Sequence, residues 1–185
     1  MTKGFSKSRD ESIKETLENT VAREFLLSYN HATRSRFRII RKGKPPEPDV
    51  ICRDASSHEQ IGIEVAVAYY DYGGRHAKAI WGPTRGKRTD PYFLARPDFE
   101  ANSSVLAHAA RIIKGKATKS YSGRVSRAFL TILLFPDRLY LSESEMEERL
   151  SNLRLPRDHP FTEIHILSQH GEVYRLFPKH GWVLG

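Results

Sequence analysis

The pattern of hydrophobic and polar positions predicts three helices in this chain. In residues 10–30, apolar side chains recur about every fourth position, which is the period of one helix face. A second helical pattern covers residues 102–116. A third helix is expected to begin at the capping box Ser-Glu-Ser-Glu of residues 142–145. Residues 1–9 are polar and basic, and we expect them to be flexible.

Runs rich in β-branched and aromatic residues predict the strands. Residues 36–41 form a first strand with exposed arginines, and residues 127–135 are almost continuously apolar, as expected for a central strand covered on both faces. Residues 161–167 form the next strand, in which His165 is expected to point outward as an ordinary polar residue, and residues 172–177 a final edge strand. The alternation of these elements predicts a single α/β domain over residues 1–185, with a central mixed β-sheet flanked by helices.

Residues 48–67 predict a β-hairpin with its turn at Ser56-Ser57. In an antiparallel pair the residue numbers of partners have a constant sum, so Val50 pairs with Ile63 and Cys52 with Ile61. One face of the hairpin is then apolar. The buried Cys52 is the only cysteine, which excludes an internal disulfide and a cysteine-based zinc site.

The same register places Asp49 opposite Glu64 on the other face, where facing Cβ atoms lie about 4.5–5.5 Å apart. Two facing carboxylates repel each other unless a cation lies between them or one of them is protonated. A hard divalent cation such as Mg²⁺ suits this pair. The alternative is that Asp49 belongs to the proline-rich turn and Glu64 faces solvent.

Glu18 lies within the apolar stripe of the first helix, so its carboxylate is expected to point toward the core. It is a candidate third acidic group beside Asp49 and Glu64. The alternative is a boundary glutamate that pairs with Lys14, one turn earlier on the same helix.

The composition favours a polyanionic partner. The chain of 185 residues has 30 lysines and arginines against 22 acidic residues, and its pI is about 9.7. No secretory signal or membrane-spanning run is present, which predicts a cytoplasmic protein without a membrane partner. The eight histidines form no zinc motif, and neither a phosphate-binding nor a dinucleotide-binding glycine loop occurs.

A basic segment with several tyrosines follows the hairpin at residues 69–93. Its tyrosines can stack on bases or pack beneath a loop, and its cations can hold a phosphate backbone or form a solvated loop. The candidate nucleic-acid-binding residues are Arg75, Lys78, Arg85, Lys87, Arg88 and, on the second helix, Lys114.

The element order and the pairs Pro48-Asp49 and Glu64-Val65 resemble the PD-(D/E)XK nuclease superfamily. The resemblance covers roughly residues 10–170 in element order, and it implies a restriction-endonuclease-like αβββαβ core. It also implies that Asp49 and Glu64 bind Mg²⁺ or Mn²⁺ with the Val65 carbonyl, and that Glu18 is the acid some members supply from the first helix.

The chain departs from this family at Ala66, where the family has a lysine that positions or activates the attacking water. One explanation is a lysine from elsewhere, Lys78 first and Lys14 second. The other is a module that binds nucleic acid or a partner protein without cutting. The first explanation predicts a metal-dependent endonuclease in which Asp49, Glu64, Glu18 and Lys78 are catalytic. The resemblance favours DNA over RNA and makes a homodimer a candidate assembly, because many members pair two sites.

Overall fold

The computed structural model of the chain describes residues 4–69, 99–121, 125–135, 143–150, 153–168, 171–178 and 181–183. Its helices and strands are α1 (Gly4–Thr33), β1 (Phe37–Lys42), β2 (Val50–Asp54), β3 (Gln60–Tyr69), α3 (Phe99–Ala117), β4 (Arg127–Phe135), α4 (Glu143–Leu150), β5 (Glu163–Leu167), β6 (Val173–Phe177) and β7 (Gly181–Val183). The order of the predicted elements is confirmed.

The strands form one sheet in which they lie side by side in chain order, from β1 to β7. The pairs among β1, β2 and β3 are antiparallel, β4 is parallel to both β3 and β5, and the pairs among β5, β6 and β7 are antiparallel. Parallel neighbours need a crossover connection, and α3 and α4 lie in the two crossovers. The predicted mixed α/β sheet is therefore confirmed, whereas β6 is not an edge strand because β7 pairs with it.

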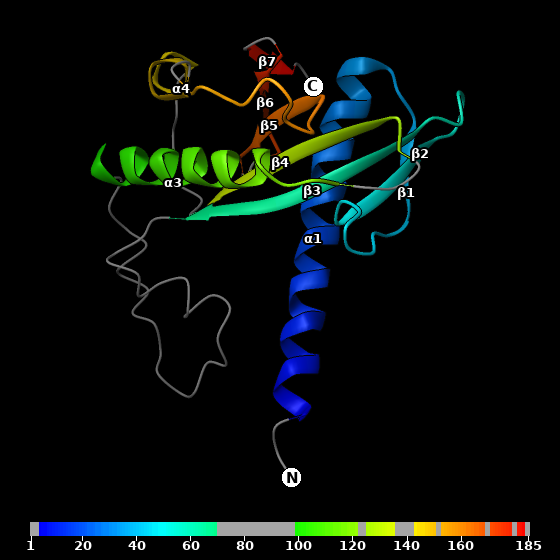
Figure 1. Ribbon diagram of the computed structural model, residues 1–185. Helices are drawn as coiled ribbons and strands as arrows, with labels where there is room; N and C mark the ends of the chain where they lie inside the picture. The colour runs from blue at the N-terminus through cyan, green and yellow to red at the C-terminus, as the bar shows by residue number, and fades with distance from the viewer. Residues whose placement is uncertain are drawn as a thin grey trace.

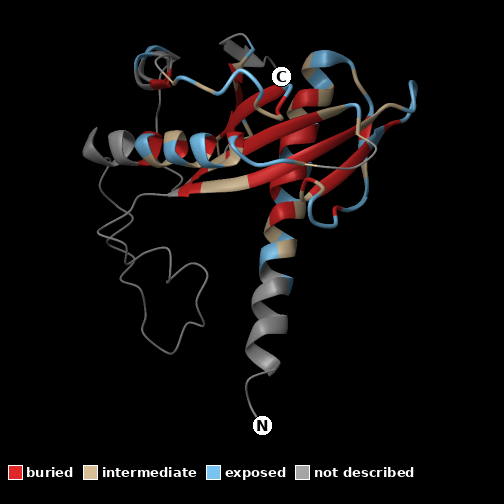
Figure 2. Cartoon of the chain, viewed as in Figure 1, coloured by how far each residue is buried: buried red, intermediate tan, exposed pale blue. Residues whose placement is uncertain are grey.

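The helices lie on both faces of the sheet (Figure 1). Helix α1 packs through Val21, Ala22 and Phe25 against one face, together with apolar residues of β2, β3 and β4. Helices α3 and α4 cover the opposite face, where Leu106 and Met146 join a second core. Buried residues are concentrated in the strands between these layers (Figure 2). The alternation of side chains along each strand thus supplies two hydrophobic cores.

Helix α1 begins at Gly4, earlier than the predicted start near residue 10, so residues 4–9, which we expected to be flexible, are helical. Its N-terminal turns extend past the sheet (Figure 1). Helix α3 begins at Phe99 and ends at Ala117, close to the predicted end. Among the described residues, no helix combines the length and the apolar character needed to span a membrane.

Candidate active site

The β2–β3 hairpin has the predicted register. Val50 pairs with Ile63, and Cys52 pairs with Ile61. These four side chains are buried in the core beneath α1. Since side chains alternate between faces, the neighbouring acidic positions point to the face that α3 covers. Burial raises the pKa of the Cys52 thiol to about 12, as expected for an inert structural cysteine.

Asp54 fixes the turn of this hairpin. Its carboxylate accepts hydrogen bonds from the backbone N–H groups of Ser56 (2.8 Å), Ser57 (2.7 Å) and Arg36 (2.7 Å). The bonds from Ser57 and Arg36 are the main reason that the pKa of Asp54 falls to about 2. A carboxylate held in this way cannot move easily to another turn position. The hydrogen bonds of Asp54 therefore fix the pairing register of β2 and β3 at the turn, which is the end of the hairpin farthest from Asp49 and Glu64.

Two glycines make room for the segment that carries Asp49. A Cβ atom on Gly43 would lie 1.7 Å from the carbonyl oxygen of Pro48, and one on Gly62 would lie 2.5 Å from the Pro48 ring. The N–H of Gly43 also donates to the Asp49 carbonyl at 2.8 Å. The Asp49 side chain then turns toward β3 and accepts a hydrogen bond from the Val65 N–H at 3.0 Å. Asp49 thus lies in the proline-rich connection just before β2, as the alternative for this residue predicted, and backbone contacts hold it on two sides.

Glu64 is buried on the face that α3 covers, with only 4 % of its surface exposed. The alternative that Glu64 faces solvent is therefore wrong. Its carboxylate forms an ion pair with Lys116 from the last turn of α3. A buried carboxylate is strongly disfavoured without such a partner. The Lys116 ammonium is thus the cation that compensates Glu64.

Tyr121 lies beside the same carboxylate. Its hydroxyl is buried and has no hydrogen-bond partner among the described residues. Its ring packs on Phe161, with 5.4 Å between ring centroids. Burial first, and then the nearby Glu64 carboxylate, raise the pKa of Tyr121. The phenol is therefore held in its neutral form, in which it can donate a hydrogen bond.

Glu18 reaches the edge of this site from α1. Its side chain is buried, as expected from its place in the apolar stripe, and it pairs with Lys14 at 3.1 Å. The predicted ion pair with Lys14 is therefore present, and the role of Glu18 as a third acidic group stays a prediction. Burial raises its pKa, and the charge of Asp49 raises it further, while Lys14 partly opposes this shift. Asp49 and Glu18 are thus close enough to interact electrostatically.

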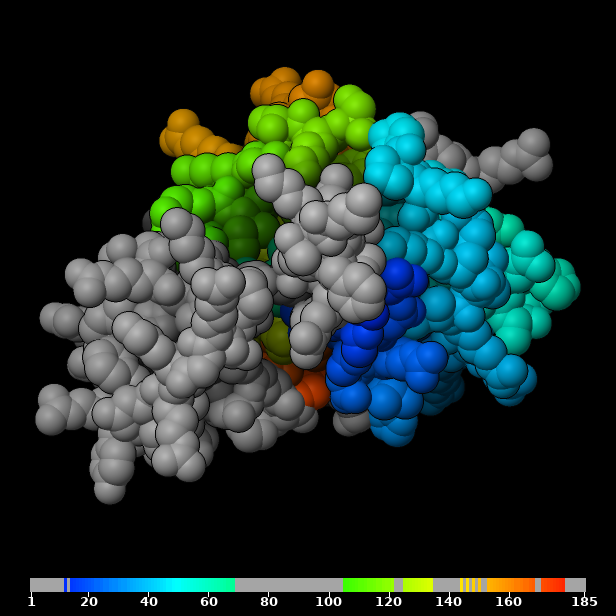
Figure 3. Space-filling model, turned by 90° about the horizontal axis from the view of Figure 1, so that it is seen from below, coloured from blue at the N-terminus to red at the C-terminus, as the bar shows by residue number. Residues whose placement is uncertain are grey.

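Residues from α1, the β2–β3 hairpin and α3 thus converge in one region. Figure 3 shows the molecule from the side to which the N-terminal turns of α1 extend. In this view the blue surface of α1 adjoins the cyan surface of the β1–β2 region, and the green surface of α3 lies in the upper part of the picture. The hydrogen bond to Glu18 is the main reason that the pKa of Lys14 is raised, and the charges of Asp49 and Glu64 raise it further. The charges of these groups influence one another, and the role of the three acids as one site stays a prediction.

The structure describes only one of the predicted nucleic-acid-binding residues, Lys114. Lys114 is exposed on α3, where it can contact a ligand at the surface. Arg75, Lys78, Arg85, Lys87 and Arg88 lie outside the described residues. The choice of Lys78 to replace the lysine missing at Ala66 therefore stays a prediction. Lys14, the second choice, is paired with Glu18 on its own helix.

Sequence reasoning missed two members of the site, Lys116 and Tyr121. The basic last turn of α3 is typical of a solvent-facing end, but the Lys116 side chain is only 22 % exposed and pairs with Glu64 of the sheet. Its position three residues after the buried Ile113 was the available signal, because such residues share a helix face. No comparable signal identified Tyr121, since it lies after α3 in a segment without a repeating pattern.

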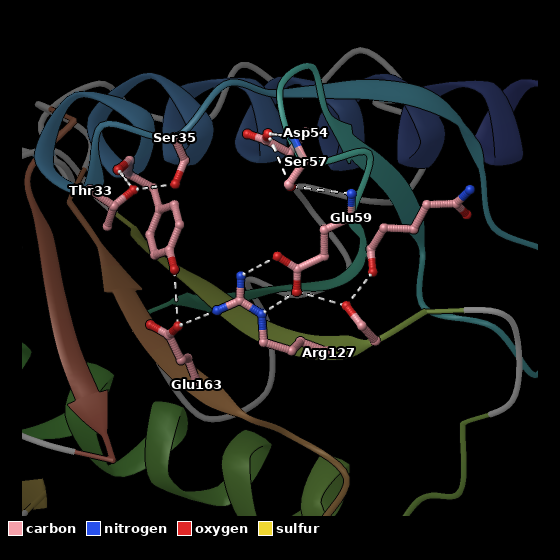
Figure 4. Close-up of polar contacts among 10 residues, drawn as sticks. Thr33, Ser35, Asp54, Ser57, Glu59, Arg127 and Glu163 are labelled. Carbon is pink, nitrogen blue, oxygen red and sulfur yellow. Dashed lines mark hydrogen bonds and ion pairs between the residues drawn. The ribbon is translucent and has the colours of Figure 1, made fainter.

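A second buried polar cluster lies on the α1 face of the sheet. Glu163 accepts a hydrogen bond from the Tyr29 hydroxyl at 2.9 Å and lies 3.6 Å from the Arg127 guanidinium. Arg127 also pairs with Glu59 through Nε at 2.8 Å (Figure 4). This cluster joins α1, β4, β5 and the β2–β3 hairpin. Because every charged member has a partner of opposite charge or a donor, we interpret it as structural.

His165 belongs to this second cluster, and the expectation that it points outward is wrong. It is fully buried, with Nε2 3.2 Å from Glu163 and its ring packed against Phe25 and Tyr29. Both faces of β5 are covered, so alternation along the strand could not place it in solvent. Burial lowers its pKa more than Glu163 raises it. His165 is therefore neutral in the folded chain at neutral pH.

Within the described residues, no three histidine, cysteine, aspartate or glutamate side chains are arranged to hold a metal ion. A metal would therefore depend on the two carboxylates of Asp49 and Glu64, with water or a ligand completing its coordination. Comparisons with protein-family models, with curated proteins and with solved structures find no match to this chain.

Proposed function

We propose that this protein is a metal-dependent nuclease that hydrolyses phosphodiester bonds in nucleic acid, with DNA favoured over RNA. The observation that carries the proposal is the buried Glu64, paired with Lys116 and adjacent in the hairpin to the backbone-anchored Asp49. Two acids and one lysine, brought together from different elements, make up the set of side chains that such hydrolysis needs. An ordinary structural ion pair explains Lys116 and Glu64 but gives no reason for Asp49.

The donor groups fit Mg²⁺ or Mn²⁺. Asp49 and Glu64 offer hard carboxylate oxygens, and Mg²⁺ is commonly held by one or two carboxylates together with water and substrate phosphate. The carbonyl of Val65 is a further candidate, because the N–H of the same residue already bonds Asp49. When bound, the ion supplies Lewis acidity at the phosphate and lowers the pKa of a bound water. Glu18 borders this pair and adds negative charge to it whenever it is ionised.

Lys116 takes the role that Ala66 leaves unfilled. Its ammonium comes from α3 across the sheet face and reaches Glu64. In this position it can stabilise negative charge that develops on a phosphate and can orient the attacking water. We therefore propose Lys116, in place of Lys78 or Lys14, as the lysine of the site. Lys14 instead compensates Glu18 and so limits the repulsion among the acids.

The fold supports the same proposal. Helix α1 followed by three antiparallel strands, the crossover helix α3 and the parallel strand β4 gives the order α, β, β, β, α, β. This is the order of the restriction-endonuclease-like core, and we propose that the chain is a variant of it. The basic composition favours a nucleic acid as the ligand, with exposed Lys114 on α3 as one contact.

A cleavage assay tests the proposal. Purified chain is incubated with single-stranded, duplex and branched DNA and with RNA, in Mn²⁺, in Mg²⁺ and in a chelator. We expect cutting that requires metal and falls at least about 100-fold in Glu64→Gln. The matched control is Glu59→Gln, which removes a paired glutamate from the turn just before β3. Binding without cutting under all conditions would overturn the proposal in favour of a non-catalytic nucleic-acid-binding module.

A further inference from the structure

The hydroxyl of Tyr121 is an unexplained polar group at the candidate site. It is buried, and no described residue gives it a hydrogen bond. Burying a hydroxyl without a partner destabilises the folded chain. The ring cannot easily turn away, because it packs on Phe161 beneath the sheet face. A buried group of this kind is expected to have a partner in some working state of the protein.

The carboxylate of Glu64 is an acceptor that interacts with the Tyr121 hydroxyl. Its negative charge and its proximity raise the pKa of Tyr121, although the contact falls outside the geometry of a full hydrogen bond. In the present arrangement Glu64 is engaged by Lys116. The carboxylate therefore already has a donor, and the phenol beside it remains without one.

We propose that Tyr121 is a positioning residue that donates a hydrogen bond to Glu64 and holds this carboxylate in place when Lys116 turns from Glu64 to a bound phosphate. The inference rests on the proposed function. The Lys116 ammonium has three N–H donors, and those that turn to a bound phosphate are lost to Glu64, so a second donor keeps this carboxylate in place during the reaction. A neutral phenol suits this role, because it orients the carboxylate without cancelling the charge that attracts a metal ion.

The experiment is a calorimetric titration of the full chain with Mn²⁺, comparing wild type with Tyr121→Phe. Phenylalanine keeps the ring on Phe161 and removes only the hydroxyl. We expect the dissociation constant for Mn²⁺ to rise about tenfold, as for the loss of one hydrogen bond to a charged group. Tyr29→Phe is the matched control, because it removes a hydroxyl beside Glu163 on the other face. Its dissociation constant should equal that of wild type.

A double-variant cycle separates positioning from a merely structural role. In the background of Lys116→Met, Tyr121 is the remaining donor to Glu64, so removing its hydroxyl should weaken Mn²⁺ binding more than in wild type. Equal Mn²⁺ affinity in Tyr121→Phe and wild type would overturn the inference, and so would equal losses in both tyrosine variants. If wild type itself binds no Mn²⁺, the proposed function fails and the inference fails with it. If wild type binds Mn²⁺ and Tyr121→Phe binds it equally well, only the inference fails.

Discussion

Glu64 is the residue on which the site depends, because an ionised carboxylate with 4 % exposure must have a compensating cation. In the structure that cation is Lys116. A divalent ion bound at Glu64 would supply the same compensation and leave the ammonium free for a phosphate. Under the proposed function, Lys116 and a metal ion would compete for one carboxylate. The effects of Lys116 on catalysis and on metal binding can therefore be measured separately.

Replacing Lys116 by methionine should have opposite effects on catalysis and on metal binding. We expect cleavage to fall about 100-fold, because the charge that stabilises the transition state is lost. The affinity for Mn²⁺ should be retained or increased, because Glu64 no longer has a competing cation. Cleavage rates and titration calorimetry measure the two effects. Lys119→Met, which removes an exposed lysine just after α3, is the control and should change neither. Loss of both cleavage and metal binding in Lys116→Met would contradict this role.

At the scale of elements, the site depends on the connection between β1 and β2. This connection brings Pro48 and Asp49 over β3, and it passes so close to Gly43 that no side chain fits there. The prolines of residues 45–48 restrict the backbone of the same segment. The position of Asp49 is thus set by the backbone and not by the packing of its own side chain.

Substituting Gly43 by alanine should therefore disturb both the fold and the site. The added Cβ would overlap the Pro48 carbonyl, and we expect a loss of about 1–3 kcal/mol in the free energy of unfolding. Urea denaturation measures this loss. Gly115→Ala is the matched control: nothing lies within 4 Å of its added Cβ in α3, so it should stabilise the chain by about 0.5–1 kcal/mol. Equal stability of Gly43→Ala and wild type would refute the close approach.

The hairpin and the helices could be predicted because their signals are local. Alternation along residues 48–67 and the polar turn fixed the pairing of Val50 with Ile63. The partner of Glu64 could not be predicted in this way, because Lys116 reaches it only through the packing of α3 on the sheet. His165 was misplaced for a related reason: alternation gives the face of a strand but not whether that face is covered.

For the whole molecule, the buried His165 predicts how stability changes with pH. Its pKa is lowered by burial, so the unfolded chain binds a proton below about pH 6.5 while the folded chain does not. Protons then favour the unfolded state, and stability is lost as the pH falls below that value. The groups that face His165 are Glu163 on its own strand, Tyr29 on α1 and Arg175 on β6. None of them reverses the direction of the shift.

We expect the free energy of unfolding to fall by at most about 1.4 kcal/mol per pH unit from His165 alone, between about pH 6.5 and the lower folded pKa. The slope should be shallower in His165→Gln, which cannot titrate. Urea denaturation of both proteins at several pH values measures the two slopes, each relative to its own stability at about pH 7. An identical slope in the variant would show that His165 does not contribute.

The claim that Asp49 and Glu64 hold a divalent cation is tested most directly by crystals of the protein grown or soaked with Mn²⁺. Anomalous diffraction locates manganese without reference to activity. We predict a peak in contact with both carboxylates, with the Lys116 ammonium displaced from Glu64. Crystals in which Lys116 still pairs with Glu64, with no manganese at the two carboxylates, would contradict the claim.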